Sequence, residues 1–388
     1  MNFSYTPEQQ AFRAEVRAWL EAHVPRRRLA SFDTREGFEQ HRAWEQELFE
    51  ARLSMVIWPK SLGGRDGDLV EWLIFEEEYW RADAPLRVNQ NGQFLLGPTL
   101  MRFGTEVQKQ RFLPRIASSQ DVWAQAWSEN GAGSDLAAIR AKAVRHGDHF
   151  IINGQKIWSS RALFADWIFG IFRSDPLADR HHGLSYILVP LSARGISVRP
   201  IKDLNGRDSF AEIFFDEVKV SVDNLIGVEG QGWELAMATA GFERSLLLRS
   251  PGRYQRTAEK LVQLYRRHRD SADRDPLLRE AVLQAWMDAE AYNLAAYHTV
   301  GRMQQGDEAG AEASANKIFW SELDLHMHET ALRILGERGE LLPEAAAAGD
   351  VDNWLEGFLF AQAGTLYAGT NEIQRNIIAE RMLGLPKA

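Results

Sequence analysis

The sequence predicts an α+β protein with a helical N-terminal domain, a central β-sandwich or β-barrel domain and a helical C-terminal domain. Three stretches that differ in residue periodicity and composition predict this order. Apolar positions recur at helical spacing up to residue 123, short β-branched and aromatic segments fill residues 124–230, and Ala, Leu, Glu and Arg dominate residues 231–388. Because the strands are gathered in one stretch, a parallel βαβ layout is excluded.

The N-terminal domain, residues 1–123, begins with a helix that carries its own start signals. Thr6 is a predicted N-cap, Pro7 is suited to the first helical position, and apolar side chains follow at helical spacing from Phe12 onward. This pattern belongs to a folded domain and not to a signal peptide. The predicted turns between the later helices are Trp58-Pro59, Gly63-Gly64 and Gly97-Pro98.

The central domain, residues 124–230, is predicted from strand-like segments separated by turn residues. The clearest segments are His149–Gly154, Trp167–Phe172, Leu184–Val189 and Glu212–Asp216. The C-terminal domain, residues 231–388, is predicted to be helical again. Its helices are expected to break at Gly306 and Gly336 and at a loop over residues 343–352.

Composition excludes several classes of function. The formal net charge of the 388 residues is −9, which disfavours nucleic acid and anionic membranes as partners. There is no cysteine, so disulfides, thiolate nucleophiles and cysteine-ligated zinc are excluded. No stretch is long and apolar enough to span a bilayer, and we expect a cytoplasmic protein.

Common catalytic and nucleotide motifs are missing as well. No Gly-x-Gly-x-x-Gly follows a strand, and neither a P-loop nor a Gly-x-Ser-x-Gly elbow occurs. His326 and His328 are two apart, so a helix would point them in different directions. No metal site is predicted.

Two patches in the central domain have compositions suited to a flat ligand. The stretch from Trp127 to Asp135, predicted at a helix-to-strand boundary, offers glycines and small hydroxyls that let the backbone approach a ligand closely. The stretch from Gly154 to Ser160, predicted as a turn entering a strand, places an aromatic ring beside hydroxyl groups. A plain loop and a core tryptophan are the alternatives for these two patches.

Two further patches lie in the C-terminal domain. Phe242-Glu243-Arg244 is predicted to lie early in a helix, where a Glu-Arg pair is most often a solvated face. The segment from Tyr367 to Ile378 joins a glycine turn to a helix that Thr370 or Asn371 would cap. Such a helix start can meet a pyrophosphate or a carbonyl oxygen, and a capped structural helix is the alternative.

In this order and spacing, the patches resemble the acyl-CoA dehydrogenase family from about residue 5 to residue 386. The most specific matches are Phe103–Glu106, Ser128–Asp135, Gly154–Trp158 and Gly369–Arg381. The resemblance implies the same three-part fold, with the C-terminal helices arranged as a four-helix bundle and the protein assembled as a tetramer of two dimers. It also implies FAD as cofactor, bound between the β domain and the C-terminal bundle.

The resemblance assigns roles to individual residues. Trp127 and Ser128 would line the flavin ring, Trp158 would wall it, and Ser160 would bond near flavin N5. Ser134 would lie where the cofactor and the CoA portions meet. Thr370 and Glu372 match FAD contacts, and Arg244 matches an arginine with a structural or substrate-binding role beside the active site.

The family reaction needs a carboxylate to remove the α-proton of a thioester while its enolate charge is stabilised. Many members carry this glutamate immediately before the Gly-Thr of the C-terminal motif, where this chain has Ala368. Ala368 would supply only its backbone N–H. A second branch, which includes bacterial steroid side-chain enzymes, places the base on an earlier helix, and Glu243 matches that position.

This departure implies a branched, cyclic or otherwise bulky acyl group, because moving the base frees volume beside the β-carbon. An electron-transfer flavoprotein is the expected acceptor. The steroid branch often assembles as α₂β₂ pairs, in which a chain that retains Glu243 would be the competent half. The stretch through Arg253 and Arg256 lacks the usual Arg-x-x-Phe-Gly contact to a neighbour's FAD, which leaves a homomeric or a heteromeric assembly open.

Two rival functions share this fold. One is an oxygen-using flavoenzyme, either an oxidase or an N-hydroxylase. The other is a non-catalytic partner subunit that stabilises an active relative.

Overall fold

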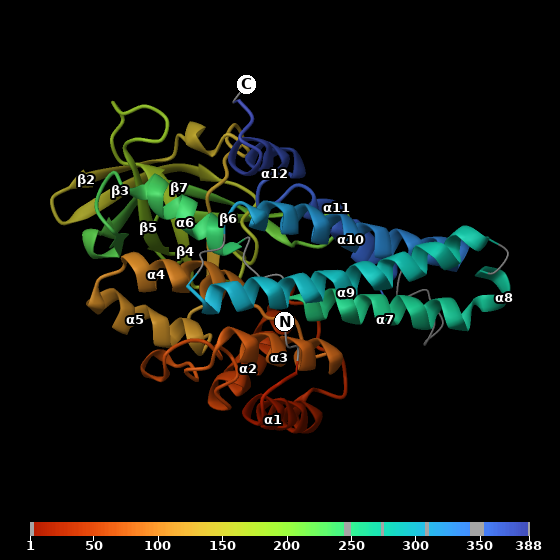
Figure 1. Cartoon of the computed structure of the whole chain (residues 1–388). Helices are drawn as coiled ribbons and strands as arrows, with labels where there is room; N and C mark the ends of the chain where they lie inside the picture. Colours follow the sequence, from red (N-terminus) through yellow and green to blue (C-terminus); the bar gives the residue numbers. More distant parts are fainter. Residues whose placement is uncertain (1–3, 244–249, 273–274, 307–309, 342–352, 387–388) are drawn as a thin grey trace. The chain divides into compact units, whose positions relative to one another are not determined.

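The computed structural model describes residues 4–243, 250–272, 275–306, 310–341 and 353–386 (Figure 1). The chain forms two compact units, each built from segments that are distant in the sequence. The first unit comprises residues 1–24, 69–84 and 244–388, and the second comprises residues 25–68 and 85–243. The three-part division into 1–123, 124–230 and 231–388 follows changes of secondary structure and stays a proposal.

The first unit is helical. Its helices are α1 (Pro7–His23), α3 (Leu69–Arg81), α7 (Pro251–Arg267), α8 (Arg269–Ala272), α9 (Pro276–Gln304), α10 (Glu312–Leu335), α11 (Trp354–Gly364) and α12 (Asn371–Ile377). Helices α7, α9 and α10 pack along one another, as Figure 1 shows. Their shared core contains Tyr254, Tyr292 and Trp320. This core is large enough to explain why three long helices stay together.

Local signals in the first unit agree with the sequence. The Thr6 hydroxyl accepts a hydrogen bond from the backbone N–H of Gln9, and the Gln9 side chain accepts one from the backbone N–H of Thr6. Helix α9 ends just before Gly306, and Gly336, with φ +57°, follows the last residue of α10. The predicted helix start and both predicted breaks are therefore confirmed. The loop predicted over residues 343–352 lies outside the described residues.

The helices of the second unit are α2 (Arg35–Glu50), α4 (Gly97–Phe103), α5 (Glu106–Ala117) and α6 (Gly232–Glu243). The turn predicted at Gly97-Pro98 is wrong, because Gly97 continues a π-helix (Asn91–Leu96) directly into α4. A Cβ atom at Gly97 would collide with the Trp58 ring. The glycine therefore serves close packing at this point and does not break the chain's helical path.

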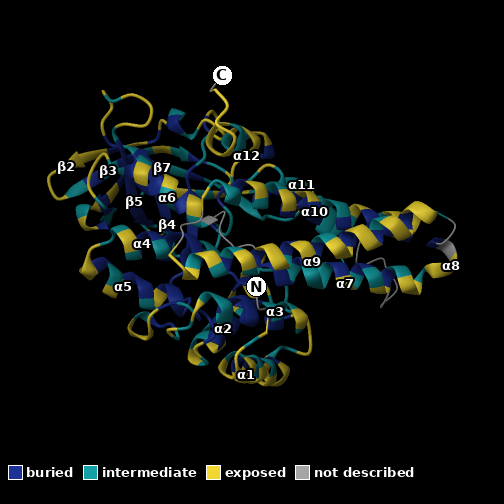
Figure 2. Cartoon of the chain, in the orientation of Figure 1, coloured by how far each residue is buried: buried dark blue, intermediate teal, exposed yellow. Residues whose placement is uncertain are grey.

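The strands of the second unit are β1 (Trp123–Ala126), β2 (Lys142–His146), β3 (His149–Lys156), β4 (Trp167–Arg173), β5 (Leu184–Pro190), β6 (Ile196–Ile201), β7 (Phe210–Ser221) and β8 (Leu225–Ile226). Within the described residues they form one sheet in the order β6-β7-β3-β2-β4-β5-β8, with β1 pairing in parallel with β4. Strands β4 and β5 are almost wholly buried (Figure 2). Loops at the ends of β1 and β3 are thereby fixed to a rigid support.

The predicted fold class is confirmed, since helices precede and follow one continuous run of strands. No helix in the described part of the chain is both long and apolar enough to cross a bilayer.

Candidate functional site

The first candidate loop, the stretch from Trp127 to Asp135, follows β1 directly. Its predicted position at a helix-to-strand boundary is therefore wrong. Trp127 is buried, with its ring edge-on to Phe169 and Tyr186 at centroid distances of 6.4 Å. Its indole Nε1 has no hydrogen-bond acceptor among the described residues. A buried N–H without an acceptor is costly, so this donor is available to a ligand.

The same loop turns sharply after Ser128 and then opens. Glu129 and Ala132 exchange two backbone hydrogen bonds of 3.0 Å. A Cβ atom added at Gly131 or Gly133 would meet nothing within 4 Å. Packing against the described residues therefore does not explain glycine at these two positions, and the open backbone leaves room for a ligand to approach closely. Ser134 is exposed in this open part of the loop.

The second candidate segment, from Gly154 to Ser160, was predicted to enter a strand. In the structure it forms the end of strand β3 and the loop after it. Strand β3 runs to Lys156, and its pairing with β7 shifts between Ile152 and Gly154. Gly154 has φ +136°, and a Cβ atom there would lie 2.7 Å from the Cα of Ala141. The glycine therefore marks a bulge that fits closely against Ala141.

An exposed indole follows this bulge. Trp158 is 57% exposed, lies edge-on to Phe210 and has φ +61°, a conformation that is uncommon for a bulky residue. Ser159 is buried, and its hydroxyl has no partner within the described part of the chain. Ser160 is half-buried. Strain and exposure of a large ring at one position are typical of ligand sites.

The structure brings the two loops together. The Lys156 ammonium donates hydrogen bonds to the Trp127 carbonyl oxygen at 3.0 Å and to the Glu129 carboxylate at 2.8 Å. The backbone N–H of Ile157 donates to the Ser128 carbonyl oxygen at 2.9 Å. Burial lowers the pKa of Lys156 to about 8, and the charge of Glu129 opposes this shift.

Sequence reasoning missed Lys156 and Glu129 as residues of this site. Both lie inside the motifs that carry the family resemblance. Their pairing joins segments 27 residues apart, which no local pattern encodes.

Helix α6 carries the predicted base at its end. Glu243 is the last residue of the described helix and does not lie early in it, which corrects the prediction. The Glu243 side chain and the whole of Arg244 lie outside the described residues. Earlier on α6, Thr239 shares a 2.7 Å hydrogen bond with Thr99 of α4. This bond joins α6 to α4 within the second unit.

The C-terminal motif forms a strained turn before α12. Ala368 has φ +57° and Gly369 has φ +78°. The Gln374 side chain donates to both carbonyl oxygens, and Thr370 caps the helix by accepting from the backbone N–H of Ile373. The structure thus assigns the cap to Thr370.

Glu372 is exposed in the first turn of α12. Hydrogen bonding to its own backbone N–H, and then to Thr370, lowers the pKa of its carboxyl. It is therefore anionic at neutral pH.

Two arginines of the first unit have partners inside that unit. Arg253 pairs with Asp324 at 2.8 Å, and Arg256 pairs with Asp83 at 2.6 Å. These ion pairs hold α7 against α10 and against the end of α3. Both arginines thus already serve packing in this chain.

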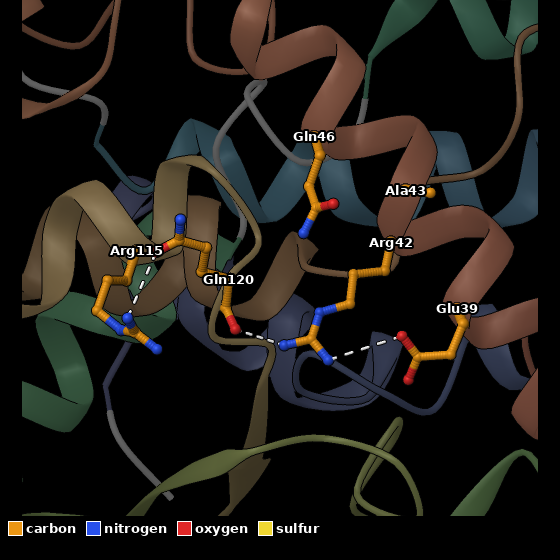
Figure 3. Close-up of a pocket in the computed structure, with 6 residues that line it drawn as sticks. All are labelled: Glu39, Arg42, Ala43, Gln46, Arg115 and Gln120. Atoms are coloured by element: carbon orange, nitrogen blue, oxygen red, sulfur yellow. Dashed lines mark hydrogen bonds and ion pairs between the residues drawn. The ribbon is translucent and has the colours of Figure 1, made fainter.

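A surface pocket of about 380 Å³ in the second unit contains none of the predicted site residues (Figure 3). Arg42 donates there to the Ser119 and Gln120 carbonyl oxygens and pairs with Asp166 at 2.7 Å. Arg115 pairs with Asp121 at 2.6 Å. Both guanidinium groups are already paired with carboxylates of the same unit and hold its segments together. This pocket is therefore not the candidate site.

The second unit therefore defines a site for a large flat ligand with polar edges. It combines an exposed indole, buried donors that find no acceptor in the described part of the chain, and an open glycine loop, all on two segments that are bonded to each other. Among the described residues, no group of three or more His, Cys, Asp or Glu side chains is arranged to hold a metal ion.

Comparison with known proteins assigns the family. Three models match in succession, described as the acyl-CoA dehydrogenase N-terminal domain (residues 6–120), middle domain (124–218) and C-terminal domain (230–383). The chain belongs to the acyl-CoA dehydrogenase family and is an FAD-dependent oxidoreductase of that family.

Individual relatives point to one branch. The chain is 42% identical to acyl-CoA dehydrogenase IpdE1 of Mycobacterium tuberculosis, over 97% of this chain and 98% of the relative. A solved structure named Tcur3481-Tcur3483 steroid ACAD superposes with a TM-score of 0.87 at 31% identity, covering 100% of both chains. The solved structure of the ChsE4-ChsE5 complex from Mycobacterium tuberculosis superposes with a TM-score of 0.81 at 30% identity, covering 100% of both chains. The family and its steroid-like branch are those that the motifs predict.

The residues present fit FAD. Trp127 Nε1 and the Ser159 hydroxyl are buried donors that lack acceptors among the described residues, and a flavin ring offers acceptors along its edge. The exposed Trp158 indole supplies a flat apolar surface of the size that a tricyclic ring can cover.

Proposed function

We propose that this enzyme desaturates a bulky acyl-CoA between its α and β carbons, with Glu243 as the base. One observation carries the assignment of the base. Ala368 precedes Gly369 and Thr370, the place where many family members carry the catalytic glutamate. A methyl group cannot take a proton. Glu243 matches the alternative position of the steroid-type branch and ends helix α6.

The chain's own groups divide the work of the reaction. Glu243 takes the α-proton of the thioester, and the backbone N–H of Ala368 donates to the thioester oxygen as enolate charge develops there. When FAD is bound, it accepts the hydride that leaves the β-carbon. Gln374 holds the carbonyl oxygens of Ala368 and Gly369, which fixes the turn that follows the Ala368 N–H before substrate arrives.

The resemblance proposes a flavin contact for each of several residues. Trp127 and Ser128 line the ring, Trp158 covers it, and Ser160 bonds near N5. The remaining contacts are given to Ser134 at the junction with CoA, Thr370 and Glu372 for FAD, and Arg244 beside the substrate. The buried donors and the exposed Trp158 ring support this assignment.

A bulky, ring-bearing or branched acyl group is the proposed substrate class. A base placed on α6, together with alanine at 368, leaves the space of a glutamate side chain free beside the substrate. The relative named steroid ACAD, 31% identical to this chain, supports the proposal of a bulky, ring-bearing acyl group.

We also propose assembly with a second acyl-CoA dehydrogenase subunit, and an electron-transfer flavoprotein as acceptor. Helix α9 exposes Leu283, Trp286, Met287 and Leu294, four apolar side chains that recur on one helical face. A helix-bearing subunit of complementary shape would bury this face. The related complexes pair two differently named chains, which favours a related rather than an identical subunit.

Anaerobic bleaching of the flavin by a panel of acyl-CoAs tests this function. Straight, branched and ring-bearing thioesters are compared with the wild type and with Glu243→Gln. Fastest bleaching by a bulky thioester is expected, with a loss of roughly 10²-fold or more in the variant, the effect of removing a general base. Full-speed bleaching of Glu243→Gln would exclude the base, and a preference for short straight chains would exclude the substrate class. Rapid peroxide formation in air would indicate an oxidase instead.

A further inference from the structure

Lys156 is an unusual residue for the end of a strand. It ends β3, and its side chain has no exposure to solvent. The ammonium lies 3.0 Å from the Trp127 carbonyl oxygen and 2.8 Å from Glu129 Oε1. It also lies 5.2 Å from the centre of the Phe172 ring. Lysine is almost never fully buried without a partner, so its contacts explain why it is tolerated here.

Glu129 is the opposite end of this ion pair and does more than neutralise it. Its side chain is 12% exposed. Oε1 accepts from Lys156 and from the backbone N–H of Ala141 at 3.0 Å, while Oε2 accepts from the backbone N–H of Arg140 at 2.6 Å. The carboxylate therefore joins the loop after β1 to the start of β2 as well as to the end of β3.

Backbone bonds complete the connection. Ile157 N–H donates to the Ser128 carbonyl oxygen at 2.9 Å. Three successive residues of one loop, Trp127 to Glu129, are thus tied to two successive residues of the other, Lys156 and Ile157. Trp158 and Ser160 come directly after the bonded residues of the second loop. Trp127 and Ser128 of the first loop take part in these hydrogen bonds through their carbonyl oxygens.

A buried ion pair is weak support for stability, because the cost of removing two charges from water offsets their attraction. An apolar pair of similar volume could fill the same space. It could not hold the Trp127 carbonyl oxygen and the two backbone N–H groups of Arg140 and Ala141 in fixed directions. Compared with an apolar pair, the charged pair therefore contributes fixed positions of the loop backbone and not a higher stability.

We infer that the Glu129–Lys156 pair is the positioning device of the flavin site, setting the spacing and orientation of the two loops that carry Trp127, Ser128, Trp158 and Ser160. Neither residue touches the cofactor in this role. The inference rests on the proposed assignment of those four residues to the flavin site.

Titration of the apoprotein with FAD tests the inference in Lys156→Met, Glu129→Gln and the double variant. Protein fluorescence gives the dissociation constant, and visible circular dichroism of the bound flavin reports its surroundings. Each variant is expected to bind FAD at least fivefold more weakly, with an altered visible dichroism band. Glu129→Gln keeps an oxygen for Lys156, and the double variant leaves no lone buried charge, so both remain usable if Lys156→Met does not fold.

Arg42→Met is the matched control, because it removes an ion pair with Asp166, in the same unit, in which neither loop takes part. It is expected to lower the melting temperature without changing the affinity for FAD. If the double variant and Glu129→Gln lower only the melting temperature, with FAD affinity changed less than fivefold, the positioning role is wrong.

Two further variants separate this failure from failure of the site itself. Trp158→Ala and Ser160→Ala are expected to weaken FAD binding directly. If both leave it unchanged, the flavin-site assignment is wrong. If both weaken it while the ion-pair variants do not, the assignment stands and only the positioning inference is overturned.

Discussion

The side-chain amide of Gln374 donates a hydrogen bond of 2.9 Å to the carbonyl oxygen of Ala368, six residues earlier. The same amide reaches Gly369 at 3.2 Å, and the Gln374 side chain is fully buried. Helix α12 therefore holds the turn that precedes it. This turn needs such a brace, because Ala368 has φ +57°, a conformation that costs about 1 kcal/mol or more for a residue with a side chain.

Gln374→Leu is expected to slow flavin reduction about tenfold or more. The substitution keeps the side-chain volume but removes the hydrogen bonds to the Ala368 and Gly369 carbonyl oxygens, so the turn that is proposed to present the Ala368 N–H to the thioester oxygen is no longer fixed. Stopped-flow absorbance during anaerobic reduction measures the rate. Arg375→Ala, which removes an ion pair exposed on both sides, is the control and should change the rate little. Equal rates in wild type and Gln374→Leu would remove Gln374 from the mechanism.

Features governed by local rules could be predicted from the sequence. Thr6 and Thr370 each cap a helix because a hydroxyl placed three residues before a backbone N–H needs no distant partner. The strand segments and the order of helices and strands follow from residue periodicity. The family motifs select the two loops that are proposed for the flavin site for the same reason, since each motif is a continuous stretch.

Features governed by distant neighbours could not be predicted. Gly97 was expected to form a turn, but the Trp58 ring occupies the space that a side chain would need and the helix continues. Gly154 was expected to open a strand, but contact with Ala141 makes it a bulge inside one. The pairing of Glu129 with Lys156 belongs to the same class, because it joins the loop after β1 to the end of β3, two segments that are distant in the sequence.

Alkaline pH is expected to stabilise the apoprotein through Lys156. Burial lowers the pKa of Lys156 from 10.5 to about 8 in the folded state. Below pH 8 both states are protonated. Between about pH 8 and 10.5 the unfolded chain binds more protons, so the free energy of unfolding rises with pH by up to about 3 kcal/mol.

Urea unfolding at a series of pH values, with Lys156→Met beside the wild type, measures this contribution. The difference in unfolding free energy between the two proteins should grow in favour of the wild type as pH increases through 8. A difference that stays constant from pH 7 to 10 would show that Lys156 titrates in its ordinary range.

Arg253→Met is expected to destabilise the helical unit by about 3 kcal/mol. Asp324 is only 3% exposed, and loss of its guanidinium partner leaves a buried carboxylate beside the His328 ring nitrogen, 3.4 Å away, without an arginine to pair with. Chemical denaturation gives the change. Arg333→Met, which breaks an ion pair with 44% exposure on both sides, should cost no more than about 0.5 kcal/mol. Similar losses in the two variants would mean that burial does not distinguish these pairs.

Trp286→Lys is expected to disrupt the assembly without unfolding the chain. Trp286 is 46% exposed on α9, and Leu283, Met287 and Leu294 share its helical face. A lysine buried at the centre of a subunit interface would lose its hydration without gaining a partner, which disfavours association. Mass determination by light scattering, alone and with a related subunit co-expressed, should show a smaller species than the wild type forms.

Ala295→Lys is the matched control, because it adds the same charge to an exposed position of the same helix about 180° from Trp286. Its mass should equal that of the wild type. If Trp286→Lys also keeps the wild-type mass, the apolar face of α9 does not contact another subunit. If the wild type reaches its full mass only with the related chain, the heteromeric proposal is supported, whereas full mass from this chain alone would establish a homomer.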